Sequence, residues 1–157
     1  MKPIIVTREL WVETWVGLRN RGKGLRESAC IWGGRREGDA DSAQSVIFLD
    51  DLPGVRAGAR YHQMSRPTID ALFGALRDRR EMIVTDIHTH PSDWVDLSPT
   101  DAQHPIEFRR GLPALVIPHF AKSAPTTHGL GLHEYLGDGA WRMLSPGEVR
   151  DVLRVAS

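Results

Sequence analysis

The stretch TDIHTHPSDWVDLSPTD, residues 85–101, joins the end of an apolar run to a polar loop and then to a helix start. His88 and His90 stand one residue apart in it, and after seven further residues Ser98 is followed by Asp101. Alternate residues of a strand point to the same face, so both imidazoles can bind one ion, with Asp101 as a third ligand. Three protein ligands leave one position for water, which is typical of catalytic zinc sites.

The segment from Ser98 to Asp101 also has the pattern of an ordinary helix start. It offers a hydroxyl at the N-cap, a proline at the first helical position and an acid at the third. A pair of strand histidines likewise needs no metal. The two interpretations are compatible, because a capped helix start holds Asp101 rigidly and directs Ser98.

Composition predicts one soluble globular domain over residues 1–157, with 41% hydrophobic residues. Twenty basic and twenty acidic side chains balance, and this argues against a nucleic-acid partner. The single cysteine excludes an intrachain disulfide, and the chain shows neither a signal-peptide pattern nor an apolar run long enough for a bilayer. We therefore expect a cytoplasmic protein with no membrane partner.

Hydrophobic periodicity predicts strands and helices without strict alternation, which favours an α/β or α+β fold with a mixed β-sheet flanked by helices. The expected helices cover 7–20, 65–80 and 145–156, with a further helix start at 98. The expected strands cover 27–34, 43–52, 58–64, 81–90 and 113–120, with a hairpin over 129–144. The glycine pair at 33–34 is expected to end the first of these strands.

The spacing of the four polar residues resembles the JAMM motif of the JAB/MPN metallo-isopeptidases. That motif is His-x-His, seven residues, Ser, two residues and Asp, and His88, His90, Ser98 and Asp101 match all of it. A proline directly after the second histidine, frequent in the family, is also present. The order of elements is similar as well, and Glu27 stands where the family carries its catalytic glutamate. The resemblance implies a JAB/MPN-like, cytidine-deaminase-like fold of the bacterial, deubiquitinase-like type.

The segment after Glu27 departs from the family pattern at one place. Cys30 occupies a position where family members often have glycine, and the glycines come at 33 and 34 instead. Glu37 is the alternative candidate for the base, although its polar neighbours are typical of a solvated turn. Because Cys30 lies in a short apolar run, we expect it to be a buried core residue rather than a nucleophile.

The resemblance also implies an activity. One Zn²⁺ per chain would be bound by His88, His90 and Asp101. Glu27 would act as general base, and Ser98 would donate a hydrogen bond to the oxyanion. The implied substrate is the peptide or isopeptide bond after the C-terminal tail of ubiquitin or a ubiquitin-like protein. Such a protein or its conjugates, and the enzymes of its conjugation, are the implied partners.

Two other functions remain open, namely a non-catalytic MPN-like scaffold and a relative of the RadC type. Two other metal-site families are excluded. An amidohydrolase-like barrel needs about 200–250 residues, whereas 67 residues follow His90. A metallo-β-lactamase-like site needs aspartate and histidine at 92 and 93, where this chain has serine and aspartate.

Overall fold

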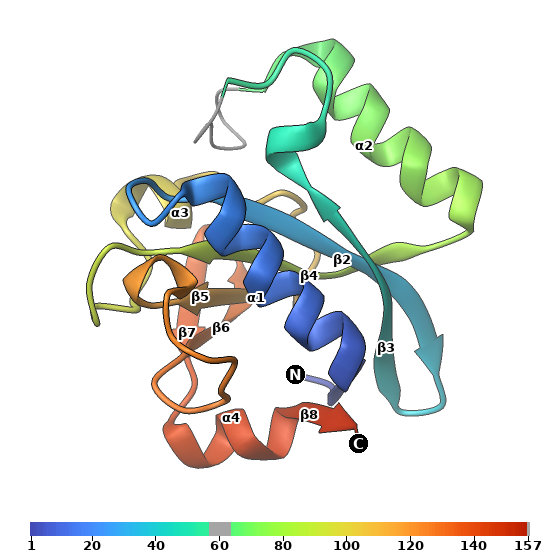
Figure 1. Cartoon of the computed structure of the whole chain (residues 1–157). Coiled ribbons are helices and arrows are strands. Elements are labelled where there is room, and N and C mark those ends of the chain that lie inside the picture. Colours follow the sequence, from blue (N-terminus) through green and yellow to red (C-terminus); the bar gives the residue numbers. More distant parts are fainter. Residues whose placement is uncertain (57–63, 157) are drawn as a thin grey trace.

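The computed structural model describes residues 1–56 and 64–156. In this part of the chain one mixed sheet holds eight strands in the order β7-β6-β5-β4-β2-β3-β1-β8 (Figure 1). Their bounds are β1 Ile4–Thr7, β2 Ala29–Glu37, β3 Ala40–Phe48, β4 Met82–Thr89, β5 Pro113–Ile117, β6 Gly131–Gly137, β7 Ala140–Met143 and β8 Leu153–Ala156. The pairs β1·β3, β1·β8 and β4·β5 are parallel, and the other neighbours are antiparallel. The expected mixed sheet flanked by helices is therefore confirmed.

The helices agree with the predicted starts. Their bounds are α1 Arg8–Gly22, α2 Arg66–Arg79, α3 Pro99–Gln103 and α4 Pro146–Val152, with short 3-10 turns η1 at Leu49–Asp51 and η3 at His119–Ala121. Thr7 caps α1 by accepting a hydrogen bond from the Leu10 N–H at 3.2 Å. Figure 1 shows α1 lying across the sheet, and both termini at one end of the molecule beside β8.

The two longer helices cover opposite faces of the sheet. On β2, Cys30 and Trp32 pack in a cluster with Trp11, Trp15 and Leu18 of α1, and all five side chains are buried. Residues that alternate with them pack in a second cluster with α2, namely Ala29 and Ile31 with Leu72 and Leu76. This alternation follows from the two-residue period of a strand. Cys30 is fully buried, as expected, and burial raises the pKa of its thiol.

Close packing of α1 on the sheet explains a glycine inside that helix. A Cβ atom at Gly17 would overlap the ring of Phe48 on β3. Glycine has an intrinsic cost within a helix, so its presence there reflects the short separation between helix and sheet.

Three predicted boundaries differ from the structure. The glycine pair does not end β2, which continues to Glu37 through register shifts at Gly33 and Gly34. A Cβ at Gly34 would overlap the Ser42 carbonyl, so the glycines permit close strand pairing there rather than a stop. The helix predicted over 145–156 ends at Val152, and β8 follows it. Strand β1 was not predicted; it lies between β3 and β8. The strand predicted over 58–64 lies, except for its last residue, outside the described residues.

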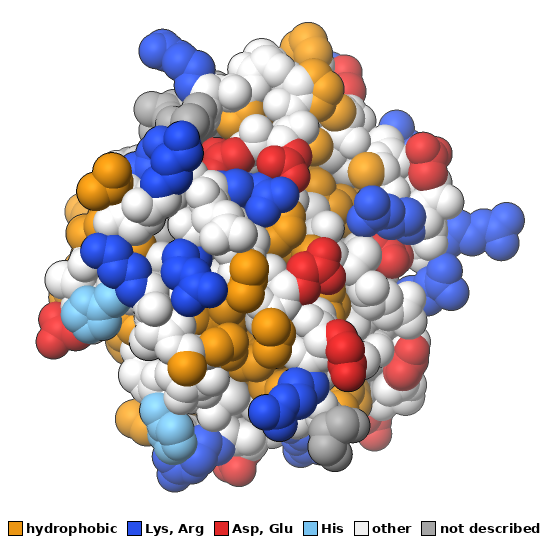
Figure 2. Space-filling model, in the orientation of Figure 1, with side chains coloured by type: hydrophobic (Ala, Val, Ile, Leu, Met, Phe, Trp, Pro, Cys, Tyr) orange, Lys and Arg blue, Asp and Glu red, His pale blue; other side chains and the backbone are white. Residues whose placement is uncertain are grey.

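The face in Figure 2 carries side chains of both charge signs, spread among hydrophobic and uncharged ones. This mixture agrees with the equal numbers of basic and acidic residues in the sequence. No helix in the described ranges is long and apolar enough to span a bilayer.

Candidate metal centre

The end of β4 places two imidazoles in the middle of the sheet. His88 pairs with Ala29 of β2 on one side and with Val116 of β5 on the other. Backbone hydrogen bonds continue past the strand, because the His90 N–H donates to the Ile117 carbonyl at 2.9 Å. Both histidines are buried. Two neighbouring strands thus fix the backbone that carries the predicted ligands.

Helix α3 brings Asp101 to the same place. The Asp101 N–H donates to Ser98 Oγ at 3.1 Å, and the Ser98 N–H donates to Asp101 Oδ2 at 3.0 Å, which is a capping box. The predicted helix start is therefore confirmed. The same carboxylate oxygen faces both histidines, so the helix cap and the candidate ligand are one group.

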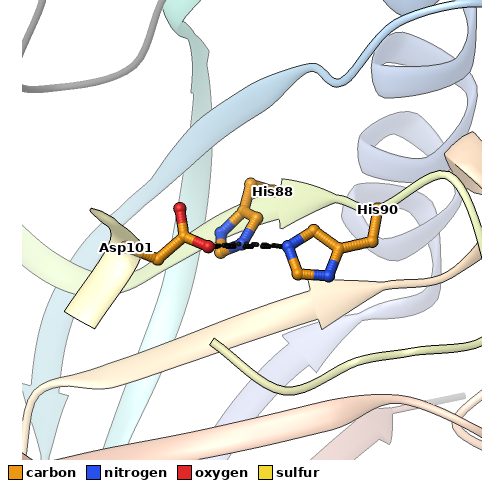
Figure 3. A group of neighbouring side chains, drawn as sticks. All are labelled: His88, His90 and Asp101. Carbon is orange, nitrogen blue, oxygen red and sulfur yellow. Dashed lines mark hydrogen bonds and ion pairs between the residues drawn. The ribbon is translucent and has the colours of Figure 1, made fainter. Parts of the chain in front are cut away.

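The three candidate ligand atoms form a compact triangle (Figure 3). His88 Nε2 and His90 Nε2 are 3.2 Å apart, and each lies 3.5 Å from Asp101 Oδ2. A tetrahedral zinc ion with bonds of about 2.0–2.1 Å keeps its ligands roughly 3.3 Å apart. The donor set therefore fits one zinc ion. Within the described residues it is the only group of three such side chains close enough to share an ion.

The charges in this cluster shift two pKa values. Burial alone lowers the pKa of His88, but the nearby carboxylates of Asp101 and Asp86 favour its charged form, outweigh burial and raise that pKa above its ordinary value. Burial alone raises the pKa of Asp101, but hydrogen bonds from His88 and His90 hold that pKa well below its ordinary value. Asp101 is thus kept ionised, the state in which a carboxylate binds a metal.

The carbonyl of Trp94 orients His90. His90 Nδ1 lies 2.9 Å from this oxygen, and the two aromatic rings stack with centroids 5.2 Å apart. A carbonyl only accepts hydrogen bonds, so Nδ1 carries the proton and Nε2 keeps its lone pair for a metal. No local sequence pattern indicates this contact, because it depends on the path of the loop over residues 91–97.

Strand β6 contacts the same loop at Val95. His133 Nε2 lies 2.9 Å from the Val95 carbonyl, and burial lowers the pKa of His133, so the neutral ring can donate there. A Cβ at Gly131 would overlap this carbonyl. Both residues were missed as contributors to the site, since they lie more than thirty residues beyond the motif.

Glu27 lies next to the ligands in the strand pairing. The Ser28 N–H donates to Thr89 Oγ1, and the Thr89 N–H donates to the Ser28 carbonyl, each at 3.0 Å. Extending this register by one residue sets Glu27 opposite His90, and alternation puts it on the face that carries His88. Glu27 is half-buried.

Glu37 is not brought to this place. It ends β2, eight residues beyond the partner of His88, a distance of about 26 Å along a strand. It is exposed and accepts a hydrogen bond from Gln44 Nε2 at 3.2 Å. Of the two candidate bases, only Glu27 has its backbone beside the ligands, and its role as a base stays a prediction.

Ser98 has its hydroxyl engaged with Asp101. Ser98 Oγ donates to Asp101 Oδ2 at 2.6 Å while it accepts from the Asp101 N–H. A role as oxyanion donor stays a prediction, and it requires the hydroxyl hydrogen to turn from Asp101 toward a substrate.

A cavity opens beside the ligands. His88 and Asp101 line it together with apolar side chains, among them Leu49, Leu97 and Trp141. An apolar wall next to a polar cluster is the usual composition of a small-molecule or peptide site. The cavity therefore reaches two of the three candidate ligands, His88 and Asp101.

No known family model matches the sequence. Solved structures are nevertheless similar in fold. A protein from Desulfitobacterium hafniense superposes with a TM-score of 0.64 at 18% identity, covering 98% of this chain and 92% of that one. A JAB1/MPN domain protein from Archaeoglobus fulgidus superposes with a TM-score of 0.52 at 13% identity over 100% of both chains. The fold is JAB1/MPN-like.

A third structure, described as a JAMM metalloprotease-like zinc site in the proteasome and signalosome, covers 99% of both chains at 12% identity with a TM-score of 0.52. Identities this low show the fold alone. In this JAB1/MPN-like fold, the cluster of His88, His90 and Asp101 is a candidate metal-binding group.

Proposed function

We propose that the protein is a zinc-dependent metallo-isopeptidase of the JAMM type. The observation that carries this proposal is the convergence of His88, His90 and Asp101 at the end of β4 in a JAB1/MPN-like fold. Their spacing suits a tetrahedral ion with three protein ligands, and water would supply the fourth ligand. An arrangement of this kind is typical of catalysis rather than of structural support.

Zinc held by these three residues would lower the pKa of a bound water molecule toward about 7 and polarise the scissile carbonyl. With the ion bound, Glu27 would serve as the general base that takes a proton from the water and returns it to the leaving amine. Ser98 would donate its hydroxyl hydrogen to the oxyanion once that hydrogen has turned away from Asp101. His90 is kept in the binding tautomer by Trp94, which avoids reorganisation during the reaction.

The proposed substrate is a peptide or isopeptide bond that follows the C-terminal tail of a ubiquitin-like protein. This class comes from the family resemblance. An extended tail can add to an exposed sheet edge, and β7 is an edge strand whose Trp141 lines the cavity beside the ligands. The conjugation enzymes of the same modifier are the proposed partners.

Metal content and cleavage together test the proposal. We expect about one zinc per wild-type chain after purification without chelator, and none in His88→Ala/His90→Ala. We also expect cleavage of ubiquitin-like proteins that carry a C-terminal fluorogenic amide or a lysine conjugate. A metal-free wild-type protein would overturn the metalloenzyme. A zinc-loaded protein that cleaves no member of such a panel would favour a scaffold.

The role of Glu27 gives a first prediction. Glu27→Gln keeps the size of the side chain but cannot accept a proton, so kcat should fall by about 10²- to 10⁴-fold while zinc stays bound. The measurements are single-turnover cleavage and zinc content. Glu37→Gln, the same change at the far end of β2, is the matched control and should cleave at the wild-type rate. Equal rates for both variants would remove Glu27 from the mechanism.

A further inference from the structure

A second carboxylate is buried close to the candidate metal centre. Asp86 lies two residues before His88 on β4, between Ile31 of β2 and Ala114 of β5. It is 5% exposed, and its Oδ1 has no hydrogen-bond partner among the described residues. An ionised carboxylate in such a place is strongly unfavourable unless a cation or a donor compensates it. The proposed reaction does not use it.

The imidazole of His88 faces this carboxylate with its other nitrogen. His88 Nε2 points to His90 and Asp101, while His88 Nδ1 lies 3.8 Å from Asp86 Oδ1. This is the one ion-pair contact that Asp86 makes in the described part of the chain. The cavity that Asp86 and His88 line is mostly apolar, with Ala29, Leu49 and Ala114 in its wall, and its other polar lining residues are Thr100, Asp101 and His104. No lysine or arginine in the described ranges pairs with Asp86, so His88 is the one basic side chain there within ion-pair distance of it.

We propose that Asp86 is a positioning residue of the metal centre, whose carboxylate accepts the Nδ1 proton of His88 and leaves His88 Nε2 free to bind the ion. This inference rests on the zinc site of the proposed function. A hydrogen bond requires the two groups to approach by roughly 0.6–1.1 Å from their present separation. Metal-bound histidines usually donate their second N–H to a carboxylate or carbonyl in this way.

The two histidines are then oriented by acceptors of different charge. His90 donates to the neutral carbonyl of Trp94, whereas His88 donates to a carboxylate. A carboxylate raises the basicity of the imidazole it accepts from, so His88 becomes the stronger ligand. The charges also balance, because Asp86 and Asp101 together supply two negative charges around a divalent ion. The ion is thus the compensation that the buried Asp86 lacks among the side chains.

Zinc affinity of Asp86 variants tests this inference. Asp86→Asn keeps an acceptor oxygen and loses the charge, and Asp86→Ala loses both. We expect zinc affinity, measured by competition with a chromophoric chelator, to fall by about 10- to 100-fold, and further in Asp86→Ala than in Asp86→Asn. Asp41→Asn is the matched control, because Asp41 on β3 is equally buried but pairs with Arg36 of β2. It should keep wild-type zinc affinity even where it lowers stability.

A spectroscopic measurement on the wild-type protein tests the same inference without any substitution. In zinc-loaded protein, ¹H–¹⁵N spectra of the imidazoles should show the His88 proton on Nδ1, hydrogen-bonded and protected from exchange. Zinc bound through Nδ1 of His88 would overturn the inference even if Asp86→Ala fails to fold. Unchanged zinc affinity in folded Asp86→Asn would overturn it as well, and would leave the proposed function intact. A wild-type chain that binds no zinc would overturn both.

Discussion

Asp101 combines a structural and a chemical task in one oxygen atom. Its Oδ2 accepts hydrogen bonds from the N–H and the hydroxyl of Ser98, and it also faces His88 and His90. The first task fixes the start of α3, and the second sets up the candidate metal centre. Because the cap restricts the Asp101 side chain, folding has already removed the rotamer entropy that a flexible carboxylate would lose on binding a metal.

Removal of the Ser98 hydroxyl separates the two tasks. Ser98→Ala should lower the free energy of unfolding by about 1 kcal/mol through loss of the cap, and should weaken zinc binding by about tenfold because Asp101 is less restrained. Ser145 forms an equivalent capping box with Glu148 at the start of α4, so Ser145→Ala is the matched control. It should cost similar stability and leave zinc affinity unchanged in chelator competition. Equal zinc affinities for both variants would show that the Ser98 cap does not restrain the ligand.

At the scale of elements, the loop over residues 91–97 is held by hydrogen bonds from several neighbouring elements. Its Trp94 carbonyl accepts from His90 at the end of β4, and its Val95 carbonyl accepts from His133 on β6. The turn η3 adds a third restraint, because the His119 N–H donates to the Ser92 carbonyl of the loop at 3.1 Å. The loop therefore acts as a rigid link between a ligand and two neighbouring elements.

A methyl group added at Gly131, next to this loop, tests whether the loop has to be rigid. Gly131→Ala puts a Cβ against the Val95 carbonyl, so the loop must move. We expect a loss of about 1–3 kcal/mol in denaturant unfolding, together with weaker zinc binding, because the displaced Trp94 no longer orients His90. Gly74→Ala on α2 is the matched control, since a Cβ there has only ordinary contact with Arg77, and it should stabilise the protein by about 0.5–1 kcal/mol. Wild-type zinc affinity in Gly131→Ala would show that the loop position is unimportant.

At the scale of the whole molecule, the sheet order brings the site together. β4 lies between β2 and β5, so the start of β2 lies beside the ligands at the end of β4. The loop over residues 91–97 lies on the other side and is bonded to β6. A bound ion would therefore cross-link several parts of the fold that are distant in sequence. Such an ion stabilises the whole protein, by about 2.7 kcal/mol when free zinc is 100 times its Kd.

The pH dependence of this stabilisation has a definite sign. The raised pKa of His88 gives the zinc-free fold a stabilisation that is present below pH 6.5 and is lost as pH rises through the raised value. The lowered pKa of Asp101 gives one that is present above pH 3.8 and is lost at lower pH. Zinc requires an unprotonated His88 Nε2, so its increment in Tm should be larger at about pH 8 than at about pH 6. Scanning calorimetry with zinc or with chelator measures it, and an increment that shrinks toward pH 8 would contradict the ligand assignment.

Much of the site was predictable because its signals are local. The His-x-His alternation, the capping box and the fixed spacing between them depend on neighbours within a strand or a helical turn. Asp86 carried a local signal as well, since it continues the same alternation two residues before His88. Gly131 and His133 carried none, because their contribution depends on which strand lies under the loop.

The sequence by itself determined the mixed α/β character, the caps of α1, α3 and α4, and the trio of candidate ligands, since hydrophobic period and capping act over a few residues. Only the tertiary structure set the start of β2 beside the candidate ligands and Glu37 far from them. It also carried β2 through its glycines and added β1 and β8 to the sheet. These outcomes depend on strand pairing between segments far apart in the chain. Register and burial are set there by the packing of the whole core, which no local pattern specifies.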